Sequence, residues 1–429
     1  MLEKLLLLPL GNFIKNKSIQ NFLFLAIIQS SNVLISIISM PLLIQNIGVD
    51  QFGLVNLALS VIVLMNVMVV YGYNLSAPRE VAINQNDKTA LSHVVSNVFS
   101  AKVLLASIAT LIILIAVFGL NLFKGYQIIL VFSILMLFSE ATLPLWFFQG
   151  MEKMKLVSIA NIFSKLLFLM GIVLFIHSPE QSRWVNFMMG FFGLSINLSL
   201  LIYIHFFLGI KFFKPDWIAI RKSLQENFLL FLSSASSYIS VNGGLIILSF
   251  FAAAETLGMY SLAERVIMVL RMFPALIIQA IYPNAAKLYT NDEKRFFKFL
   301  RNVYFRVLAL GAFISGITFF SAPFIIKVLS RSDLPDSIIY LQILAFVPFL
   351  ACLNIANVVM MLVADLKNLL FRASWMMCLY MIVVATILTS LFGGIGVSLA
   401  IISTEVIVFL ICMVLLYRNN RKFIHGFYT

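Results

Sequence analysis

Residues 257–281 read LGMYSLAERVIMVLRMFPALIIQAI, a stretch long and apolar enough to cross a bilayer as one helix, yet it carries three charged side chains. A charge near the bilayer centre costs about 2.5–3.5 kcal/mol on insertion scales, so such residues usually face a partner or a wet cavity. Helical geometry places Glu264 and Arg271 on one face, roughly 10 Å apart along the axis, and turns Arg265 about 100° away. Pro274 removes a backbone hydrogen bond and predicts a kink just beyond Arg271.

Two interpretations of these charges are open. In the first, they form a structural ion pair between neighbouring helices. In the second, which we favour, the arginines form a cationic site for an anionic ligand inside a membrane cavity. Three further charged residues interrupt other apolar runs, namely Glu140, Lys165 and Glu405.

The composition indicates an integral membrane protein. The chain has 429 residues, 62% of them hydrophobic and only 11% charged, whereas about a quarter of a soluble domain is charged. Apolar runs of membrane-spanning length occupy most of the chain, and the connectors leave no room for a soluble domain. Twelve spans are predicted: 22–46, 53–75, 93–119, 125–148, 156–177, 184–208, 227–250, 257–281, 303–327, 338–364, 371–392 and 395–417.

The distribution of basic residues predicts the orientation. With the N-terminus placed in the cytoplasm, the connectors hold 21 Lys and Arg residues on the inner side and 4 on the outer side. Cytoplasmic loops are enriched in these residues, so both termini are expected in the cytoplasm. The net charge of +13 therefore indicates basic loops and not a nucleic-acid partner.

The two halves of the chain resemble each other. The sequence at 52–58 aligns with that at 257–263, and the same offset of 205 residues pairs Pro78 with Pro283. Because six spans per half is an even number, the halves share one orientation and predict two parallel six-helix lobes with a cleft between them. The expected parts are a short interfacial helix at 1–20, an N-terminal lobe at 21–210, a cytoplasmic linker at 211–226, a C-terminal lobe at 227–417 and a cytoplasmic tail at 418–429.

The chain lacks the motifs of several enzyme classes. The three cysteines lie inside apolar runs, so neither a disulfide framework nor a metal site is expected. We find no Walker loop, no nucleophile elbow and no dinucleotide fingerprint. These absences favour a transporter without a cofactor over an enzyme.

Two motifs carry a resemblance to a known family. YGYNLSAPRE at residues 71–80 and WFFQGMEKM at 146–154 resemble the signatures of Wzx-type polysaccharide repeat-unit flippases. That family belongs to the multidrug/oligosaccharidyl-lipid/polysaccharide exporter superfamily, so the resemblance implies a MATE-like fold. It also implies a substrate, an undecaprenyl-diphosphate-linked oligosaccharide moved from the cytoplasmic to the outer leaflet of the bacterial inner membrane for O-antigen, capsule or related polysaccharide. A polysaccharide polymerase and a chain-length regulator are the implied protein partners, beside membrane lipids.

Charge and depth select the candidate site residues. The expected contacts to the diphosphate and sugars are Arg271, Arg265, Lys165, Asn32, Asn242 and Gln279. The carboxylates expected to bind a coupling proton or sodium ion, or to balance an arginine, are Glu264, Glu140 and Glu405. The expected gate residues at inner span ends are Arg79, Glu80, Glu152 and Lys153. Lys102 and Arg306, near other span ends, are expected to extend to the lipid headgroups.

Two alternatives remain. An ion-coupled small-molecule exporter of the same superfamily would share the fold, but a cation exporter favours an acidic cavity, whereas basic residues here are at least as numerous in mid-span. A membrane polymerase or glycosyltransferase typically needs a sizeable catalytic loop outside the bilayer. The connectors of this chain are too short to build one.

Overall fold

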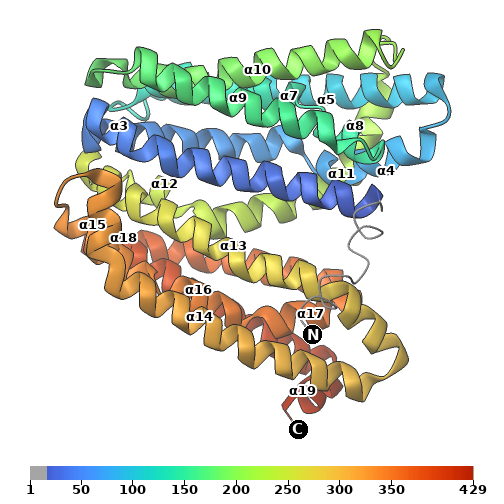
Figure 1. Ribbon diagram of the computed structural model, residues 1–429, viewed down its shortest axis with the longest axis vertical. Coiled ribbons are helices and arrows are strands. Elements are labelled where there is room, and N and C mark those ends of the chain that lie inside the picture. The colour runs from blue at the N-terminus through green and yellow to red at the C-terminus, as the bar shows by residue number, and fades with distance from the viewer. Residues whose placement is uncertain (1–16, 429) are drawn as a thin grey trace, which may run out of the picture. The chain divides into compact units, whose positions relative to one another are not determined.

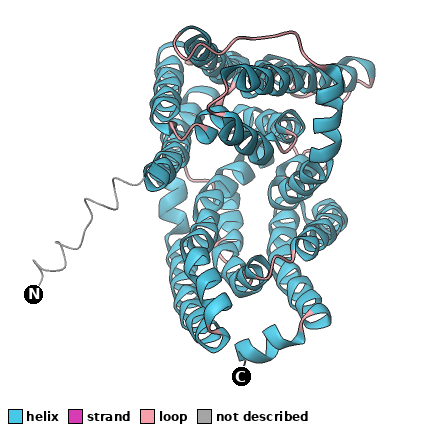
Figure 2. Ribbon diagram, turned by 90° about the vertical axis from the view of Figure 1, so that its right-hand side faces the viewer, coloured by secondary structure: helices cyan, strands magenta, loops and turns pink. Residues whose placement is uncertain are grey.

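The computed structural model describes residues 17–428, which are helical over most of their length and contain no strand (Figures 1 and 2). The interfacial helix predicted at 1–20 lies largely outside the described residues. Nine helices in the described part are long and apolar enough to cross a membrane. The chain is therefore an all-α, multi-pass membrane protein, as its composition predicts.

The number of spans follows from two bends. The helices Ile27–Asn84 and Lys367–Asn419 are too long for single spans, at 58 and 53 residues. Each is bent at a glycine with a positive φ, 82° at Gly48 and 56° at Gly393, a conformation that other residues rarely adopt. Each therefore holds two spans, and the helix at 217–242, continued by 244–248, supplies one more. The total confirms the prediction of about twelve.

The chain divides into two compact units. Unit 1 comprises residues 1–47 and 61–232, and unit 2 comprises 48–60 and 233–429. The helices that lie wholly or partly in unit 1 are α3 (Lys17–Val70), α4 (Tyr73–Asn84), α5 (Lys88–Leu114), the π-helical turn Ile115–Gly119, α6 (Gln127–Ser133), α7 (Leu135–Thr142), α8 (Leu145–Gly150), α9 (Met154–Phe175), the 3-10 turn Pro179–Gln181, α10 (Ser182–Phe206) and α11 (Trp217–Asn242).

Unit 2 also contains parts of two helices that begin in unit 1. Residues 48–60 of α3 and the end of α11 belong to it. Its remaining helices are α12 (Gly244–Leu248), α13 (Ala254–Asn291), α14 (Glu293–Ser330), α15 (Pro335–Leu344), α16 (Val347–Leu353), α17 (Ile355–Val363), α18 (Lys367–Asn419) and α19 (Arg421–Tyr428).

The internal repeat is visible in the cores of the two units. Leu91 and Val95 of α5 are buried in the core of unit 1. At the offset of 205 residues, Phe296 and Leu300 of α14 are buried in the core of unit 2. Equivalent positions of the two halves thus point into equivalent cores, as expected for parallel repeats.

Two glycines let helices of unit 2 meet backbone to backbone. A methyl group at Gly258 of α13 would overlap the carbonyl oxygen of Val49. One at Gly53 of α3 would overlap the backbone nitrogen of Gly258. Small residues at such crossings allow the close packing that holds helices together in a membrane. Residues 48–60 are therefore fixed tightly against the start of α13.

The predicted linker is bound to unit 1 along α5. Three backbone N–H groups of residues 211–216 donate to the side chains of Ser92, Ser96 and Asn97, at 3.0, 2.8 and 3.0 Å. These contacts satisfy backbone donors of a segment that has no regular secondary structure of its own.

Candidate functional site

The deep charges of unit 2 are paired with groups of the protein. Arg271 of α13 donates through Nη2 to Glu405 of α18, and its Nη1 donates to the carbonyl oxygen of Val241 at 3.3 Å. Glu405 is only 5% exposed. The pair links three helices of unit 2, which favours the first of the two interpretations for Arg271, a structural ion pair.

Arg265 is also engaged within unit 2. Its Nε and Nη2 both donate to Oδ1 of Asn56, at 3.2 and 2.7 Å. The amide of Asn56 is held in turn, because its Nδ2 donates to the carbonyl oxygen of Phe52 at 2.8 Å. Residue 56 belongs to the α3 segment that packs on α13, so this contact fixes the same crossing as the glycines.

Glu264 directly precedes Arg265 on α13 and is buried, with 7% exposure. Tyr260, one turn earlier on α13, donates its hydroxyl to Glu264 Oε1 at 3.2 Å. The positive charges of Arg265 and Arg271 also act on this carboxyl. In the described part of unit 2, two arginines therefore face two glutamates deep in the spans, and the charges balance.

Unit 1 contains a buried lysine whose role the sequence analysis missed. Lys102 of α5 is 1% exposed, and its Nζ donates to the backbone carbonyl oxygen of Glu140 at 2.7 Å. The prediction that Lys102 extends to the headgroups is wrong. The physical reason lies at Pro144, which has no N–H to donate to the carbonyl oxygen of Glu140, four residues earlier. The helix is therefore interrupted between α7 and α8. The ammonium group donates to this carbonyl oxygen beside the backbone N–H of Leu143, which lies 3.3 Å from it.

A second lysine lies near the same carboxylate. Lys165 of α9 is half-buried, and its charge acts on Glu140 together with that of Lys102. In the described part of unit 1, two lysines and one glutamate lie deep in the spans. With all three ionised, this region has a surplus of one positive charge, in contrast to the balance of unit 2.

The predicted amide contacts differ in their surroundings. Asn32 of α3 is half-buried, and its Oδ1 is buried without a hydrogen-bond partner in the described structure. Asn161, one turn before Lys165 on α9, has an Oδ1 in the same state. Asn242 instead donates to Tyr238 O of its own helix at 3.4 Å, and Gln279 is exposed. Asn161 is not among the predicted site residues, although an amide four residues before a mid-span lysine shares its helix face.

The two family motifs meet in unit 1. A methyl group at Gly150, in the second motif, would lie 2.6 Å from both the carbonyl oxygen of Pro78 and Cβ of Val81, so the end of α8 packs against α4 backbone to backbone. Arg79, Glu152 and Lys153 are exposed. No described contact joins the four predicted gate residues to one another.

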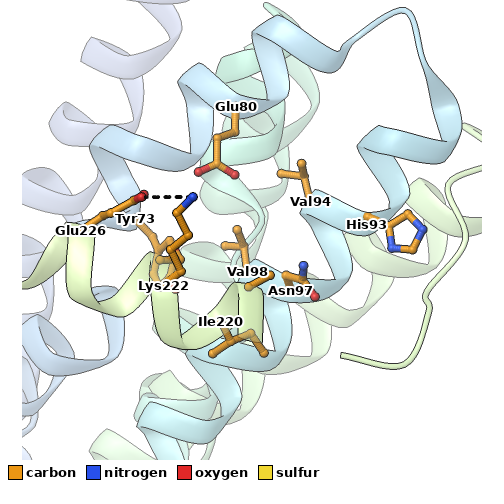
Figure 3. A pocket seen from close by; sticks show the side chains of 11 residues that line it. Tyr73, Glu80, His93, Val94, Asn97, Val98, Ile220, Lys222 and Glu226 are labelled. Carbon is orange, nitrogen blue, oxygen red and sulfur yellow. Dashed lines mark ion pairs between the residues drawn. The ribbon is translucent and has the colours of Figure 1, made fainter. Parts of the chain in front are cut away.

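Glu80 lines a cavity of about 250 Å³ between α4, α5 and the start of α11 (Figure 3). Across the cavity from Glu80, Lys222 and Glu226 of α11 form an ion pair at 4.0 Å. His93 and Asn97 of α5 form a further part of the lining. The first motif thus places one carboxylate beside α11, whose first ten residues lie within the linker predicted at 211–226.

Comparisons with known proteins agree with the motifs. Residues 18–289 match the family model described as polysaccharide biosynthesis protein. A protein of Escherichia coli (strain K12) named "Putative O-antigen transporter" is 25% identical over 413 residues, which cover 94% of this chain and 97% of that protein. A protein of the same name from Shigella dysenteriae is 26% identical over 401 residues, covering 91% and 98%.

Solved structures share the fold at low sequence identity. An inward-facing multidrug resistance MATE family transporter of the MOP superfamily has a TM-score of 0.68 and 12% identity, covering 92% of this chain and 99% of that one. The lipid II flippase MurJ, in an inward closed conformation, has a TM-score of 0.67 and 15% identity, covering 95% and 90%. Two parallel six-helix lobes of the MATE-like type are therefore the fold of this chain.

Proposed function

Because this chain belongs to the polysaccharide biosynthesis protein family, we propose that it is a transporter that flips undecaprenyl-diphosphate-linked oligosaccharide repeat units from the cytoplasmic to the outer leaflet. The names of its two relatives support transport of an O-antigen component. The proposed location is the bacterial cytoplasmic membrane with both termini inside, on the strength of the 21-to-4 distribution of basic residues.

The observation that carries this proposal is that lysines outnumber glutamates two to one deep in the spans of the described part of unit 1. A diphosphate is a dense anion, and moving it through hydrocarbon without partners is prohibitive. The ammonium of Lys165 can replace part of its hydration by charge-assisted hydrogen bonds, while Lys102 is held by the carbonyl oxygen of Glu140. A multidrug-type cation exporter would instead favour an acidic surplus, so the same observation disfavours it.

The arginines of unit 2 have a different place in the proposal. Arg271 is bound by Glu405 and Val241, and Arg265 by Asn56, so both must exchange partners before they bind a diphosphate. We place the first capture of the anion on Lys165, which lies near Glu140 in the unit whose deep lysines outnumber its glutamate. The substrate contacts predicted for Arg271, Arg265, Asn242 and Gln279 stay predictions.

Alternating access is the proposed mechanism. An inward-open cleft admits the diphosphate and its sugars, the lobes rock, and the head group leaves outward while the polyprenyl tail stays in lipid. Resetting the empty carrier calls for a coupling ion, a proton or sodium. Glu140, beside two lysines, and Glu264, beside two arginines, are the proposed carboxylates, whereas Glu405 is bound by Arg271. The gate roles of Arg79, Glu80, Glu152 and Lys153 stay predictions.

The test uses cells that lack this gene. Undecaprenyl-linked saccharides are isolated after treatment with a glycosidase confined to the periplasm, which reports the leaflet that holds them. We expect complete repeat units to accumulate in protected form, and the restored gene to expose them. Repeat units that are already exposed without the gene would assign the chain to another step.

Lys165→Met and Lys155→Met form a matched pair for the same assay. Lys155 lies on the same helix but is exposed near its start, so its loss should leave transport unchanged. Loss of the Lys165 charge removes a charge-assisted hydrogen bond and should lower the exposure rate by roughly 10-fold or more. Equal rates for the two variants at equal protein levels would remove Lys165 from the anion site.

A further inference from the structure

Two hydrogen bonds define how α3 and α9 lie against each other in unit 1. Ser158 Oγ of α9 donates to the carbonyl oxygen of Phe24 at 3.2 Å. Asn46 Nδ2 of α3 donates to the carbonyl oxygen of Ile176, just past the end of α9, at 2.8 Å. The two helices therefore run side by side and in the same direction between these contacts (Figure 1). We call this line of contact the α3–α9 seam.

The register of the seam brings polar residues to one depth. Asn32 lies eight residues beyond Phe24, about 12 Å along the axis, and Lys165 lies seven residues beyond Ser158, about 10 Å along its own. Asn161 lies one turn earlier on α9, about 6 Å from the level of Lys165. The seam thus contains two amides and an ammonium within about one and a half helical turns of each other in depth.

Helical geometry also directs these residues toward the seam. Lys165 returns to within about 20° of the face of Ser158, which contacts α3, and Asn161 lies about 60° from that face. On α3, Asn32 lies fourteen residues before Asn46 and therefore about 40° from the face that contacts α9. The residues face one another from the two sides of the seam.

The hydrogen-bonding state of the amides indicates what the seam is built to bind. The Oδ1 atoms of Asn32 and Asn161 are buried acceptors without a partner in the described structure. Such atoms are uncommon in native proteins, because an unsatisfied buried polar group costs about 1–3 kcal/mol. They call for a ligand that donates hydrogen bonds. An ionised phosphate offers only acceptors, whereas a sugar offers several hydroxyl donors.

We propose that the α3–α9 seam binds the junction between sugar and diphosphate: Asn32 and Asn161 accept hydrogen bonds from hydroxyls of the first sugar, and Lys165 donates to the adjoining phosphate. This inference rests on the proposed function and adds to it a recognition rule. The seam distinguishes a glycosylated diphosphate lipid from a bare one, so the carrier lipid without its sugars is a poorer ligand. Such a preference would favour transport of loaded over empty carrier.

Binding to the purified full chain in lipid nanodiscs tests this rule. The probes are farnesyl diphosphate and three farnesyl-diphosphate-linked sugars, carrying N-acetylglucosamine, glucose or galactose. We expect at least one glycosylated probe to bind more tightly than farnesyl diphosphate. Asn161→Leu and Asn32→Leu should each weaken that probe by roughly 3- to 10-fold and leave farnesyl diphosphate unchanged. Unchanged binding of the bare lipid also shows that each variant is folded.

Two further variants sharpen the test. Lys165→Met should weaken the bare and the glycosylated probes alike, because it acts on the phosphate they share. Asn302→Leu, an exposed asparagine of α14, should change neither. The inference fails if the wild type binds bare and glycosylated probes equally, or if both seam variants retain its preference. Failure of the wild type to bind any diphosphate lipid would instead overturn the proposed function, and the seam assignment with it.

Discussion

Unit 1 and unit 2 are built on one repeat, yet they treat deep charges differently. In unit 2, Arg271 is bound by Glu405, and Arg265 by Asn56 beside Glu264. In unit 1, Lys102 donates to a backbone carbonyl oxygen, and Glu140 is near both Lys102 and Lys165. Equivalent apolar cores therefore do not imply equivalent polar interiors. The difference is one of count: the deep arginines and glutamates of unit 2 are equal in number, whereas the deep lysines of unit 1 outnumber its glutamate.

The two arrangements have different energetic consequences. A buried ion pair contributes little net stability, but removing one partner leaves an uncompensated charge and is strongly destabilising. A surplus cation lowers the stability of the empty protein slightly and is compensated when an anion binds. The comparison thus predicts that changes in unit 2 act on stability, and that Lys165 in unit 1 acts on binding.

The largest effect is expected at the ion pair of unit 2. Arg271→Met or Glu405→Leu alone should lower the free energy of unfolding by about 3–5 kcal/mol, because each leaves its partner charged and buried. The double variant should be as stable as the wild type or more so, because it removes both charges. Denaturant titration in mild detergent measures all four proteins.

The same double variant tests whether the pair serves transport. If the pair only joins helices, the double variant should expose repeat units at the rate of the wild type. A stable double variant without transport would show that Arg271 takes part in the transport cycle, and would break the contrast between the units.

An intermediate effect is expected at the break between α7 and α8 in unit 1. Lys102→Met removes the shorter of the two hydrogen bonds to the carbonyl oxygen of Glu140 and should cost about 1–3 kcal/mol of stability. Adding Pro144→Ala restores a backbone N–H at the position that this carbonyl lacks, and should recover part of the loss. If Pro144→Ala aggravates the loss, the lysine does not compensate for the proline.

Effects of opposite sign, the second of them the smallest of all, are expected at two helix glycines of unit 2. Gly258→Ala should cost about 1–3 kcal/mol, because the new methyl group meets the carbonyl of Val49. Gly316→Ala is the matched control, since no atom lies within 4 Å of its added methyl group. This substitution should raise the free energy of unfolding by about 0.4–1 kcal/mol, because alanine lowers the conformational entropy of the unfolded chain. Thermal unfolding should show a lower melting temperature for Gly258→Ala and a higher one for Gly316→Ala than for the wild type.

The sequence predicted the fold because membrane insertion depends on local composition. Apolar run lengths, the offset of 205 residues and the two motifs gave the twelve spans, the parallel lobes and the family. They could not give the partners of deep charges. Glu405 lies 134 residues from Arg271, and Asn56 lies 209 residues from Arg265, so only the packed structure shows which residues meet.

One missed feature was within reach of the sequence. A proline four residues after Glu140 leaves a carbonyl without its helical donor, and such a carbonyl in mid-membrane calls for a cation or hydroxyl nearby. Lys102, counted from its own span end, looks shallow enough to reach the headgroups. The Lys102 side chain instead points to the break between α7 and α8, and the packing of α5 against α7 that brings them together cannot be derived from either segment alone.

The α3 segment at residues 48–60 has a consequence for the synthesis of the protein. Its packing partners on α13, Gly258 and Arg265, follow about 200 residues later in the chain, as the 209-residue separation of Asn56 from Arg265 shows. At translation rates of about 5–20 residues per second, the ribosome needs roughly 10–40 s to deliver them. During that interval, Gly53 and the side-chain amide of Asn56 have no contact with Gly258 and Arg265 of α13. The helix crossing between residues 48–60 and α13 can therefore form only after α13 has itself been synthesised.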